Sequence, residues 1–322
     1  MVTMPNIEDF NNADYDPFEA ELFAFGDLLD VHGAIAKLRR EKGDVIPGTF
    51  LELVGVRPDD SPPTFTLLGY DDVANALLDY ENFTNAVFHT TLGRTFGNTL
   101  SLMEPPGHTQ YRRLFQKAFL PQNIARWGTE IVDVVVDELI GKVRGRGEAD
   151  LIEEFTKRYP FEIIYRQLAL PEGDGPIFHR LASSQLMPQT TEGQEAAGKL
   201  GTYFKALLDE RRRNPGPDLA SALVTAEIEG EQLPEDVVIS FLRQLIAAAG
   251  DTTFRATSVT LTGLLTNPDQ LDAVKADRSL IPQTVEEGLR WETPTSWTER
   301  TAARDMVAVS YTHLTLPTNR EV

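Results

Sequence analysis

The sequence predicts a mainly α-helical protein with a small β-hairpin region near its N-terminal end. Three observations carry this prediction. Apolar residues recur at helical spacing along most of the chain after residue 71, two short strand-like runs precede it, and one apolar helical pattern continues from Glu235 to Thr266. The 322 residues contain no repeats and no low-complexity linker, so a single domain is expected.

The first expected elements are a helix and a hairpin. The helix runs from Val31 to Arg40 and stops at Gly43. The runs TFLELVG (49–55) and TFTLLGY (64–70) are strand-like, and the turn-rich RPDDSPP between them predicts a hairpin. Helices are then expected in DDVANALLDY, HTQYRRLFQKAF, TEIVDVVVDELIGKV, FEIIYRQLAL, GKLGTYFKALLDERRR and VEEGLRWETP.

Charge and composition narrow the class of protein. The formal net charge of −19 argues against nucleic acid or an anionic membrane surface as the main partner. No stretch approaches the roughly 18 uninterrupted apolar residues of a membrane span, and the acidic N-terminus lacks the features of a signal peptide. We expect a cytoplasmic monomer with no nucleic-acid or membrane partner. The sequence contains no cysteine, which excludes disulfides and thiolate sites from this chain.

The centre of the long apolar helix is unusual, because Gly250-Asp251-Thr252-Thr253 are poor helix formers. One interpretation is two helices, with Gly250 as a C-cap and Asp251 or Thr252 as the next N-cap. The other is one continuous buried helix. Steps of 3.6 residues favour the continuous helix, because they give one unbroken stripe of Val238, Leu242, Leu245, Ala249, Thr252, Ala256 and Val259. Ala248 to Gly250 then leave a bare surface against which a flat molecule could lie.

A basic stripe lies in EPPGHTQYRRLFQKAF (104–119). His108 and Arg112 are one helical turn apart, and Arg113 and Lys117 extend the stripe. Cations in a first turn oppose the helix dipole, which indicates an anionic partner. The alternative is a solvated basic face that pairs with the protein's own carboxylates.

Two further clusters lie near the C-terminal end. In VEEGLRWETP, Glu286 is four residues before Arg290 and Glu287 is three residues before it. An exposed pair at either spacing would contribute little to stability. In TERTAARD, Arg300 follows a proline-containing segment that is expected to be extended.

Together, these clusters resemble the cytochrome P450 monooxygenases of the soluble bacterial type, in the same order and spacing. The family's central-helix motif of small residues, an acid and a threonine matches residues 248–252. Its Glu-x-x-Arg pair matches Glu287 and Arg290, and its early His-x-x-x-Arg helix matches His108 and Arg112. Trp291 to Pro294 and Arg300 fit the family's path into a strand beside the haem. The resemblance extends from the hairpin to about Asp305.

The resemblance implies a haem b cofactor against the central helix. His108, Arg112 and Arg300 would bind its propionates through charge-assisted hydrogen bonds, and Ala248 and Ala249 would face the ring. Asp251 and Thr252 would be the catalytic residues that deliver protons for O–O cleavage. The threonine hydroxyl would bond to a carbonyl one turn earlier and open the helix locally. Glu287 and Arg290 would form a buried structural ion pair on the proximal side.

The function that the resemblance implies is insertion of one oxygen atom from O₂ into a hydrophobic small molecule. Electrons would come from NAD(P)H through a ferredoxin-type redox partner, docked on the basic stripe. The expected substrate-lining residues, besides the region around Leu186-Met187-Pro188, are Phe88, Leu92, Phe96 and Trp297. A role in the protein core would explain their apolar character equally well.

One departure from the family is decisive. The family's iron is held by a cysteine thiolate in a loop after the Arg300 region, and this sequence has no cysteine. Residues 309–322, VSYTHLTLPTNREV, resemble a translated sequencing adaptor. We therefore expect residues 1–308 to be a partial cytochrome P450-like domain, truncated before the ligand loop and inactive, and residues 309–322 to be a non-native tail.

The sequence leaves two alternatives to an oxygenase. The first is a non-catalytic, all-helical binding protein that has lost its metal site. The second is an Mg²⁺-dependent isoprenoid enzyme, which needs aspartate-rich motifs on helices. It is disfavoured because Asp59-Asp60 lies in a turn and Asp71-Asp72 lacks a third acid.

Overall fold

The computed structural model describes residues 31–48, 64–171, 174–228, 230–304, 306–307 and 315–316. The described residues fall into two compact units. The larger unit lies within residues 91–296, and the smaller is built from described residues within 31–90 and 297–316.

The smaller unit begins with α1, Val31–Lys42, which ends at Gly43 as the sequence predicted. Gly43 has a φ of +91°, a conformation that glycine adopts without steric cost. Strand β1, Val45–Pro47, pairs antiparallel with β2, Phe65–Leu67. The predicted second hairpin strand is thus confirmed at its centre. The predicted first strand at 49–55 and the RPDDSPP turn lie outside the described residues, and the sequence did not predict β1.

The rest of the smaller unit joins its two stretches of sequence. After α3, Tyr70–Leu78, strand β3, Phe83–Thr84, pairs antiparallel with β6, Thr301–Ala302. This pairing places residues near 300 beside α4, Ala86–Thr90. Strand β7, Met306–Val307, pairs with β8, Thr315–Leu316, and these two residues of β8 are the only part of 309–322 that the structure describes.

The larger unit is helical, in agreement with the predicted fold class. The predicted helices are present, although their bounds shift by a few residues. Two of them, α8 and α9, are preceded by π-helical turns. In chain order its elements are α5 Gly93–Phe96, η2 Leu100–Leu102, α6 Gly107–Ala118, α7 Pro121–Trp127, η3 Gly128–Val132, α8 Asp133–Val143, η4 Ile152–Thr156, α9 Tyr159–Gln167, α10 Gly175–Ser184, α11 Thr191–Arg213, α12 Leu219–Val224, β4 Glu227–Ile228, β5 Glu231–Gln232, α13 Glu235–Thr266, α14 Pro268–Ala276, η5 Arg278–Leu280 and α15 Ile281–Trp291.

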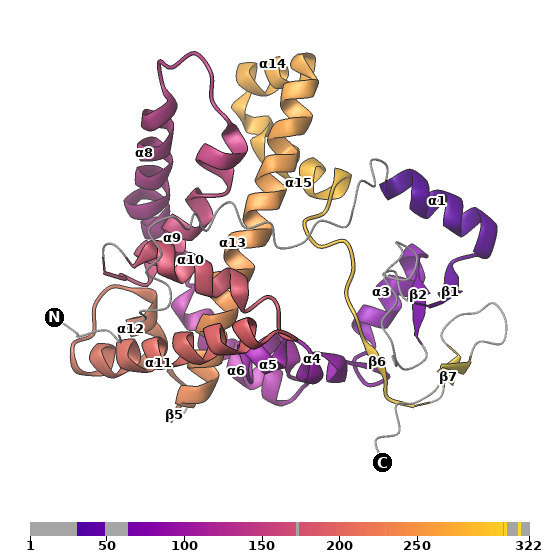
Figure 1. Ribbon diagram of the computed structural model, residues 1–322, viewed down its shortest axis with the longest axis horizontal. Helices are drawn as coiled ribbons and strands as arrows, with labels where there is room; N and C mark the ends of the chain where they lie inside the picture. Colours follow the sequence, from indigo (N-terminus) through magenta and orange to yellow (C-terminus); the bar gives the residue numbers. More distant parts are fainter. Residues whose placement is uncertain are drawn as a thin grey trace. The chain divides into compact units, whose positions relative to one another are not determined.

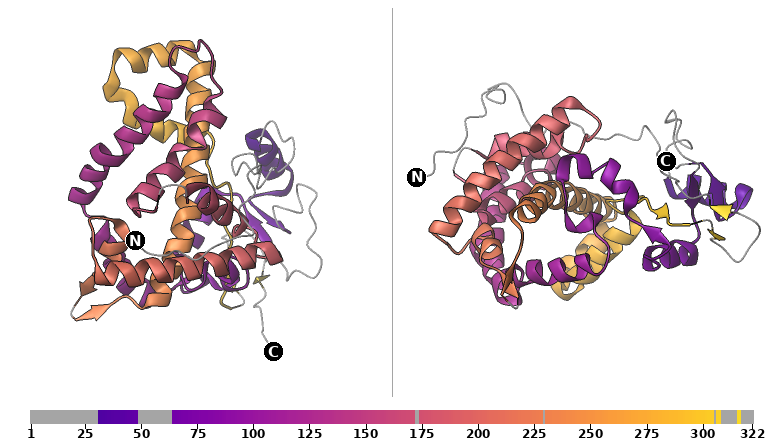
Figure 2. Two further views of the ribbon diagram at one scale, coloured as in Figure 1. Left: turned by 60° about the vertical axis from the view of Figure 1, so that its left-hand side comes forward. Right: turned by 90° about the horizontal axis from the view of Figure 1, so that it is seen from below.

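Helix α13 is the central element of this unit, and its bounds are those that the sequence predicted. Pro234 precedes its first residue, and Asn267 and Pro268 follow its last. Helix α11 crosses its N-terminal half, and α14 and α15 lie at its C-terminal end (Figures 1 and 2). The buried residues of α13 all lie in its first half: Val237, Val238, Ser240, Leu242, Ile246, Ala247 and Gly250.

The hydrophobic core gathers around that first half of α13. Phe115 of α6 stacks on Phe241 with ring centroids 4.0 Å apart, and Phe178 of α10 meets Tyr203 of α11 edge-on at 4.3 Å. Burying such aromatic side chains removes a large apolar area from water. These contacts fix α13 between α6, α9, α10 and α11.

Helix α13 is also the one helix of the described residues that is long and apolar enough to cross a membrane. An 18-residue stretch of it has a mean hydropathy of 1.2, and 39% of that stretch is buried within the protein. Length and composition alone also select the core helices of soluble proteins. The contacts of α13 with α5, α9, α10, α11 and α15 give it the position of such a core helix.

Candidate functional site

The centre of α13 is one continuous helix, so the interpretation as two capped helices is wrong. The Thr252 hydroxyl donates a hydrogen bond to the carbonyl oxygen of Ala248, 2.6 Å away and one turn earlier, as predicted. The helix remains regular around this bond and does not open. The same bond recurs along the second half of α13, at Thr257, Thr260, Thr262 and Thr266.

Asp251 is less buried than the sequence led us to expect. Its side chain is 30% exposed, and both carboxylate oxygens accept hydrogen bonds from Nε of Arg255, at 2.9 and 3.1 Å. Arg255 lies outside the predicted apolar stripe, although its spacing of four residues from Asp251 is the usual one for an ion pair on a helix. Asp251 is thus a paired carboxylate with access to water.

The small residues before Asp251 do not form one bare surface. A Cβ on Gly250 would lie 2.2–2.6 Å from three atoms of the Phe161 ring, so this glycine allows α9 to pack closely on α13. Ala247 is 1% exposed and Ala249 packs against the core, whereas Ala248 is exposed. Residues 248 and 250 point about 200° apart on a helix, which explains why position 250 faces α9 while Ala248 is exposed. Ala248 is the part of the motif that remains open.

Helix α6 presents the predicted cationic residues on its surface. His108 is half-buried, Arg112 and Arg113 are exposed, and His108 and Arg112 lie one turn apart. Within the part of the chain that the structure describes, no hydrogen bond or ion pair engages the side chains of these three residues. Lys117 instead donates to the carbonyl oxygen of Glu227 in β4. The alternative of a stripe paired with the protein's own carboxylates therefore finds no support among the described residues.

Arg300 and Phe88, both predicted site residues, come together within the smaller unit. The β3–β6 pairing aligns Thr84 with Thr301, and the Arg300 guanidinium lies 5.9 Å from the centre of the Phe88 ring. Its Nη1 also donates to the carbonyl oxygen of Glu299 at 2.7 Å and to the Thr298 hydroxyl at 3.2 Å. Arg300 has no carboxylate partner among the described side chains.

The other predicted substrate-lining residues differ in burial. Phe96 of α5 is 3% exposed and belongs to the buried residues of the larger unit, whereas Leu92 is half-buried. Trp297, in the smaller unit, is 37% exposed. For Phe96, the alternative of a core position is therefore the better description of this structure.

The Glu287–Arg290 pair is formed, but its predicted burial is wrong. Nε and Nη2 of Arg290 donate to the two carboxylate oxygens of Glu287 at 2.7 and 2.6 Å, while Glu286 takes no part. The two side chains are 60% and 69% exposed. Helix α15 packs on α13 through Gly288, which faces Thr260, so the neighbouring Glu287 and Arg290 point away from this contact. The hydrogen bonds from Arg290 hold the pKa of Glu287 below its ordinary value.

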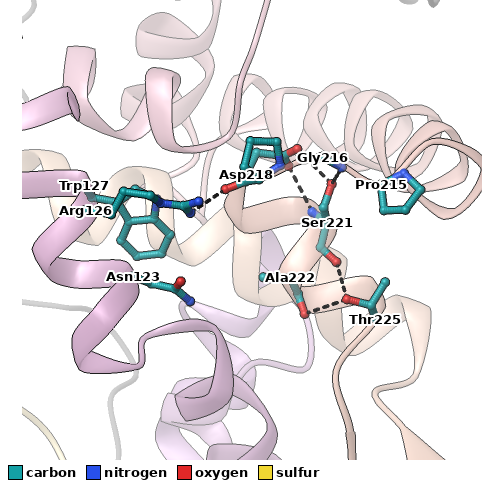
Figure 3. Close-up of a pocket in the computed structure, with 10 residues that line it drawn as sticks. Asn123, Arg126, Trp127, Pro215, Gly216, Asp218, Ser221, Ala222 and Thr225 are labelled. Atoms are coloured by element: carbon teal, nitrogen blue, oxygen red, sulfur yellow. Dashed lines mark hydrogen bonds between the residues drawn. The ribbon is translucent and has the colours of Figure 1, made fainter.

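A cavity of about 230 Å³ lies between α7 and the segment that leads into α12 (Figure 3). None of the predicted site residues lines it. Its polar groups bond mainly to one another: Arg126 donates to the carbonyl oxygen of Pro217 at 2.8 Å, and Asp218 accepts from the Ser221 hydroxyl at 2.8 Å. Arg211 pairs with Asp218 from α11 at 3.0 Å. The cavity is thus a hydrogen-bonded junction that fixes α12.

The side chains present fit part of a haem group. His108 and Arg112 in the larger unit, and Arg300 in the smaller unit, are each hydrogen-bond donors without carboxylate partners among the described residues. Propionates require donors of this kind. Ala248 leaves the helix surface open beside Thr252. A thiolate ligand for the iron, in contrast, cannot come from these 322 residues, because none of them is cysteine.

Comparison with known proteins places this arrangement in a family, although no family model matches the chain. Over 294 residues the chain is 31% identical to the methyl-branched lipid omega-hydroxylase of Mycobacterium tuberculosis, covering 85% of the chain and 67% of that protein. It is 28% identical over 301 residues to cytochrome P450 107B1 of Saccharopolyspora erythraea, covering 85% and 69%. A Bacillus subtilis protein named as a cytochrome P450, YjiB, is 31% identical over 259 residues, covering 77% and 64%. The chain thus spans about two thirds of the length of these relatives.

Solved structures agree with the sequence relatives. The chain matches cytochrome P450 CYP109Q5 from Chondromyces apiculatus with a TM-score of 0.75 and 29% identity, covering 89% of the chain and 70% of that structure. It matches cytochrome P450 TbtJ1 with a TM-score of 0.74 and 29% identity, covering 94% and 76%. The helical architecture, the acid–threonine pair within α13 and these relatives agree: the chain belongs to the cytochrome P450 family.

Proposed function

We propose that this chain is the greater part of a haem-thiolate monooxygenase that inserts one oxygen atom from O₂ into a hydrophobic small molecule. The observation that carries this proposal is the pair at the centre of α13, where Thr252 is bonded to Ala248 and Asp251 is paired but open to water. Electrons would come from NAD(P)H through a ferredoxin-type partner, for which the exposed cations of α6 offer a docking surface.

The residues that would hold haem b are those with free donors or open backbone. His108, Arg112 and Arg300 would bind the propionates, and Ala248 would face the ring, whereas Ala249 packs against the core. When bound, haem supplies the reductive activation of O₂ and the transfer of one oxygen atom to the substrate. The thiolate that would hold the iron would come from sequence outside these 322 residues, and this chain would be inactive without it.

Thr252 and Asp251 would transfer protons from water into the site. Because the Thr252 hydroxyl donates its hydrogen to Ala248, its lone pairs remain to accept a hydrogen bond from a group beside the helix. Asp251 is near enough to solvent to exchange a proton with water, and Arg255 fixes its carboxylate. A proton would move from water to the Asp251 carboxyl and onward through the Thr252 hydroxyl.

Substitution of the complete gene product tests this assignment. Thr252→Val removes the hydroxyl and keeps the shape, and we expect it to lower the product formed per O₂ consumed by about 100-fold. Thr262→Val is the matched control, because Thr262 makes the same bond to a carbonyl one turn earlier. Equal effects of the two substitutions would contradict a catalytic role for Thr252.

The absence of cysteine favours a second candidate, a non-catalytic helical binding protein that has lost its metal site. The coding sequence beyond codon 308 separates the two candidates. An extension with a cysteine loop, and a haem-thiolate Soret band in the extended protein, is expected for the oxygenase. An extension without cysteine, or a folded but colourless protein, supports the binding protein.

Location and assembly are part of the same proposal. A net charge of −19 supports a protein that acts free of nucleic acid and of anionic membranes. We propose a cytoplasmic monomer, with residues 309–322 as a non-native tail. Size-exclusion chromatography of the chain with and without residues 309–322 tests the monomer, which should elute at its own mass in both forms.

A further inference from the structure

The cavity between α7 and α12 has one side on which the polar groups satisfy one another (Figure 3). The Asp218 carboxylate accepts hydrogen bonds from the backbone N–H and the hydroxyl of Ser221, at 2.9 and 2.8 Å. Arg211 pairs with the same carboxylate at 3.0 Å and neutralises its charge. The Ser221 hydroxyl also accepts from the backbone N–H of Gly216 at 2.8 Å. The α12 side of the cavity therefore presents no unpaired charge to a guest.

Arg126, on the α7 side, is only partly satisfied. One N–H of Nη2 donates to the carbonyl oxygen of Pro217 at 2.8 Å. The Nε–H is buried and has no hydrogen-bond partner, and Nη1 bonds to no group in the described part of the chain. The Glu130 carboxylate lies 3.9 Å from Nε, which is beyond hydrogen-bond distance, and its side chain is 65% exposed. A buried donor without an acceptor is unfavourable, so this guanidinium indicates a missing acceptor.

The rest of the cavity suits a small, flat guest. Its apolar lining consists of Trp127, Pro215, Pro217 and Ala222. Asn123 uses one amide hydrogen in a bond to a backbone carbonyl oxygen and keeps the second for a guest. The volume of about 230 Å³ is below the roughly 300–1,000 Å³ of sites for drug-sized ligands, and a water takes only about 30 Å³. The space therefore holds several waters or one substituted ring.

We propose that this cavity is a binding site for a small aromatic carboxylic acid. The carboxylate accepts charge-assisted hydrogen bonds from Arg126, and the Asn123 amide is a second donor. The ring lies against Trp127 and the two prolines, so that its apolar area is removed from water. A bound acid bridges α7 and α12. The site shares no residue with those assigned to haem or to proton transfer, so the inference goes beyond the proposed function.

Probes that differ in the head group or in the ring test the chemistry of the site. Benzoate, benzyl alcohol and acetate are titrated into the full 322-residue chain and followed by calorimetry. We expect benzoate to bind at least about tenfold more tightly than the alcohol, which cannot make a charge-assisted pair, or than acetate, which has no ring to bury. Arg126→Gln should remove the preference for the acid over the alcohol, and Arg126→Lys should keep part of it. The matched control is Arg278→Gln, because Arg278 is an exposed residue of η5 that does not line the cavity, and it should leave the preference unchanged.

Two further measurements test where the acid binds. Of the three tryptophans, only Trp127 lines the cavity, whereas Trp291 and Trp297 are exposed. Saturating benzoate should therefore shift the indole N–H signal of Trp127 in an NMR spectrum and leave the other two in place, and Trp127→Phe identifies that signal. Ala222→Leu puts a larger side chain into the cavity and should weaken benzoate binding several-fold. Circular dichroism of each variant confirms that it is folded.

Five results would overturn the assignment. They are no binding of benzoate, an affinity for the alcohol or for acetate that equals that for benzoate, a preference for the acid that survives Arg126→Gln, a shift at another tryptophan in place of Trp127, and binding that Ala222→Leu leaves unchanged. The first would mean that the cavity holds only water. None of them bears on the oxygenase proposal, which depends on haem loading and on Thr252 in the extended protein.

Discussion

The two halves of α13 differ in what surrounds them, although one helical stripe runs through both. Every buried residue of the helix lies between Val237 and Gly250, and from Asp251 to Thr266 each residue is half-buried or exposed. The first half is enclosed by α6, α9, α10 and α11. The second half is contacted by α14 and α15, and by η4 and α9 through hydrogen bonds between the hydroxyls of Thr156 and Ser258 and of Tyr159 and Thr257. Periodicity therefore predicts which side of a helix is apolar, and neighbouring elements decide whether that side is buried.

Truncating one leucine in each half of α13 should give the largest difference in the free energy of unfolding. Leu242 is 0% exposed, and Leu242→Ala should lower the free energy of unfolding by about 2–5 kcal/mol, through lost burial and a cavity. Leu265 is 55% exposed, and Leu265→Ala should change it by no more than about 0.5 kcal/mol. Urea denaturation followed by circular dichroism measures both. Similar losses would mean that the second half is as well packed as the first.

Glycine substitution should give a smaller contrast of the same kind. Gly250→Ala forces a Cβ into the Phe161 ring, which is 6% exposed, and should destabilise the fold by about 1–3 kcal/mol. Gly263→Ala meets an edge atom of the Trp291 ring at 2.9 Å, but this ring is 43% exposed and can move. The gain in helix propensity, about 1 kcal/mol, should then leave Gly263→Ala neutral or stabilising. If Gly263→Ala lowered the free energy of unfolding as much as Gly250→Ala, the Trp291 ring would be held in place.

The smallest expected effect concerns the exposed pair on α15. Arg290 lowers the pKa of Glu287 from its ordinary 4.5, so the folded state favours the carboxylate. The contribution of the pair is therefore present at neutral pH and is lost as the pH falls below 4.5 and through the lowered pKa. An NMR titration should show the pKa of Glu287 rising towards its ordinary value in Arg290→Gln. No change on substitution would mean that the pair is absent in solution.

Much of the fold follows from local signals. The bounds of α13 were predicted because Pro234 and Asn267-Pro268 stop the helix on both sides, and α1 because Gly43 ends it. The bond from Thr252 to Ala248 depends only on a hydroxyl in a helix, so it too was predictable. Strand β1 was missed because three residues that include a proline carry no alternation, and its existence depends on pairing with β2.

The surroundings of the candidate site were harder to predict. The spacing of Glu287 and Arg290 gives their contact, but not their exposure, because exposure depends on what packs over α15. The sequence predicts Gly250 on a surface for a flat ligand, whereas the ring of Phe161, 89 residues earlier, occupies that side.

The threonines in the second half of α13 have a consequence for how that half responds to drying. Each hydroxyl that donates to the carbonyl four residues earlier already has its hydrogen satisfied within the helix. When water is displaced from such a surface, no donor is stranded, so dehydration costs far less than it would for a serine or threonine that relies on solvent. These threonines can therefore gain or lose contact with water without a change in the hydrogen bonds of the helix. Such a surface can be covered by an apolar molecule at little cost in lost hydrogen bonds.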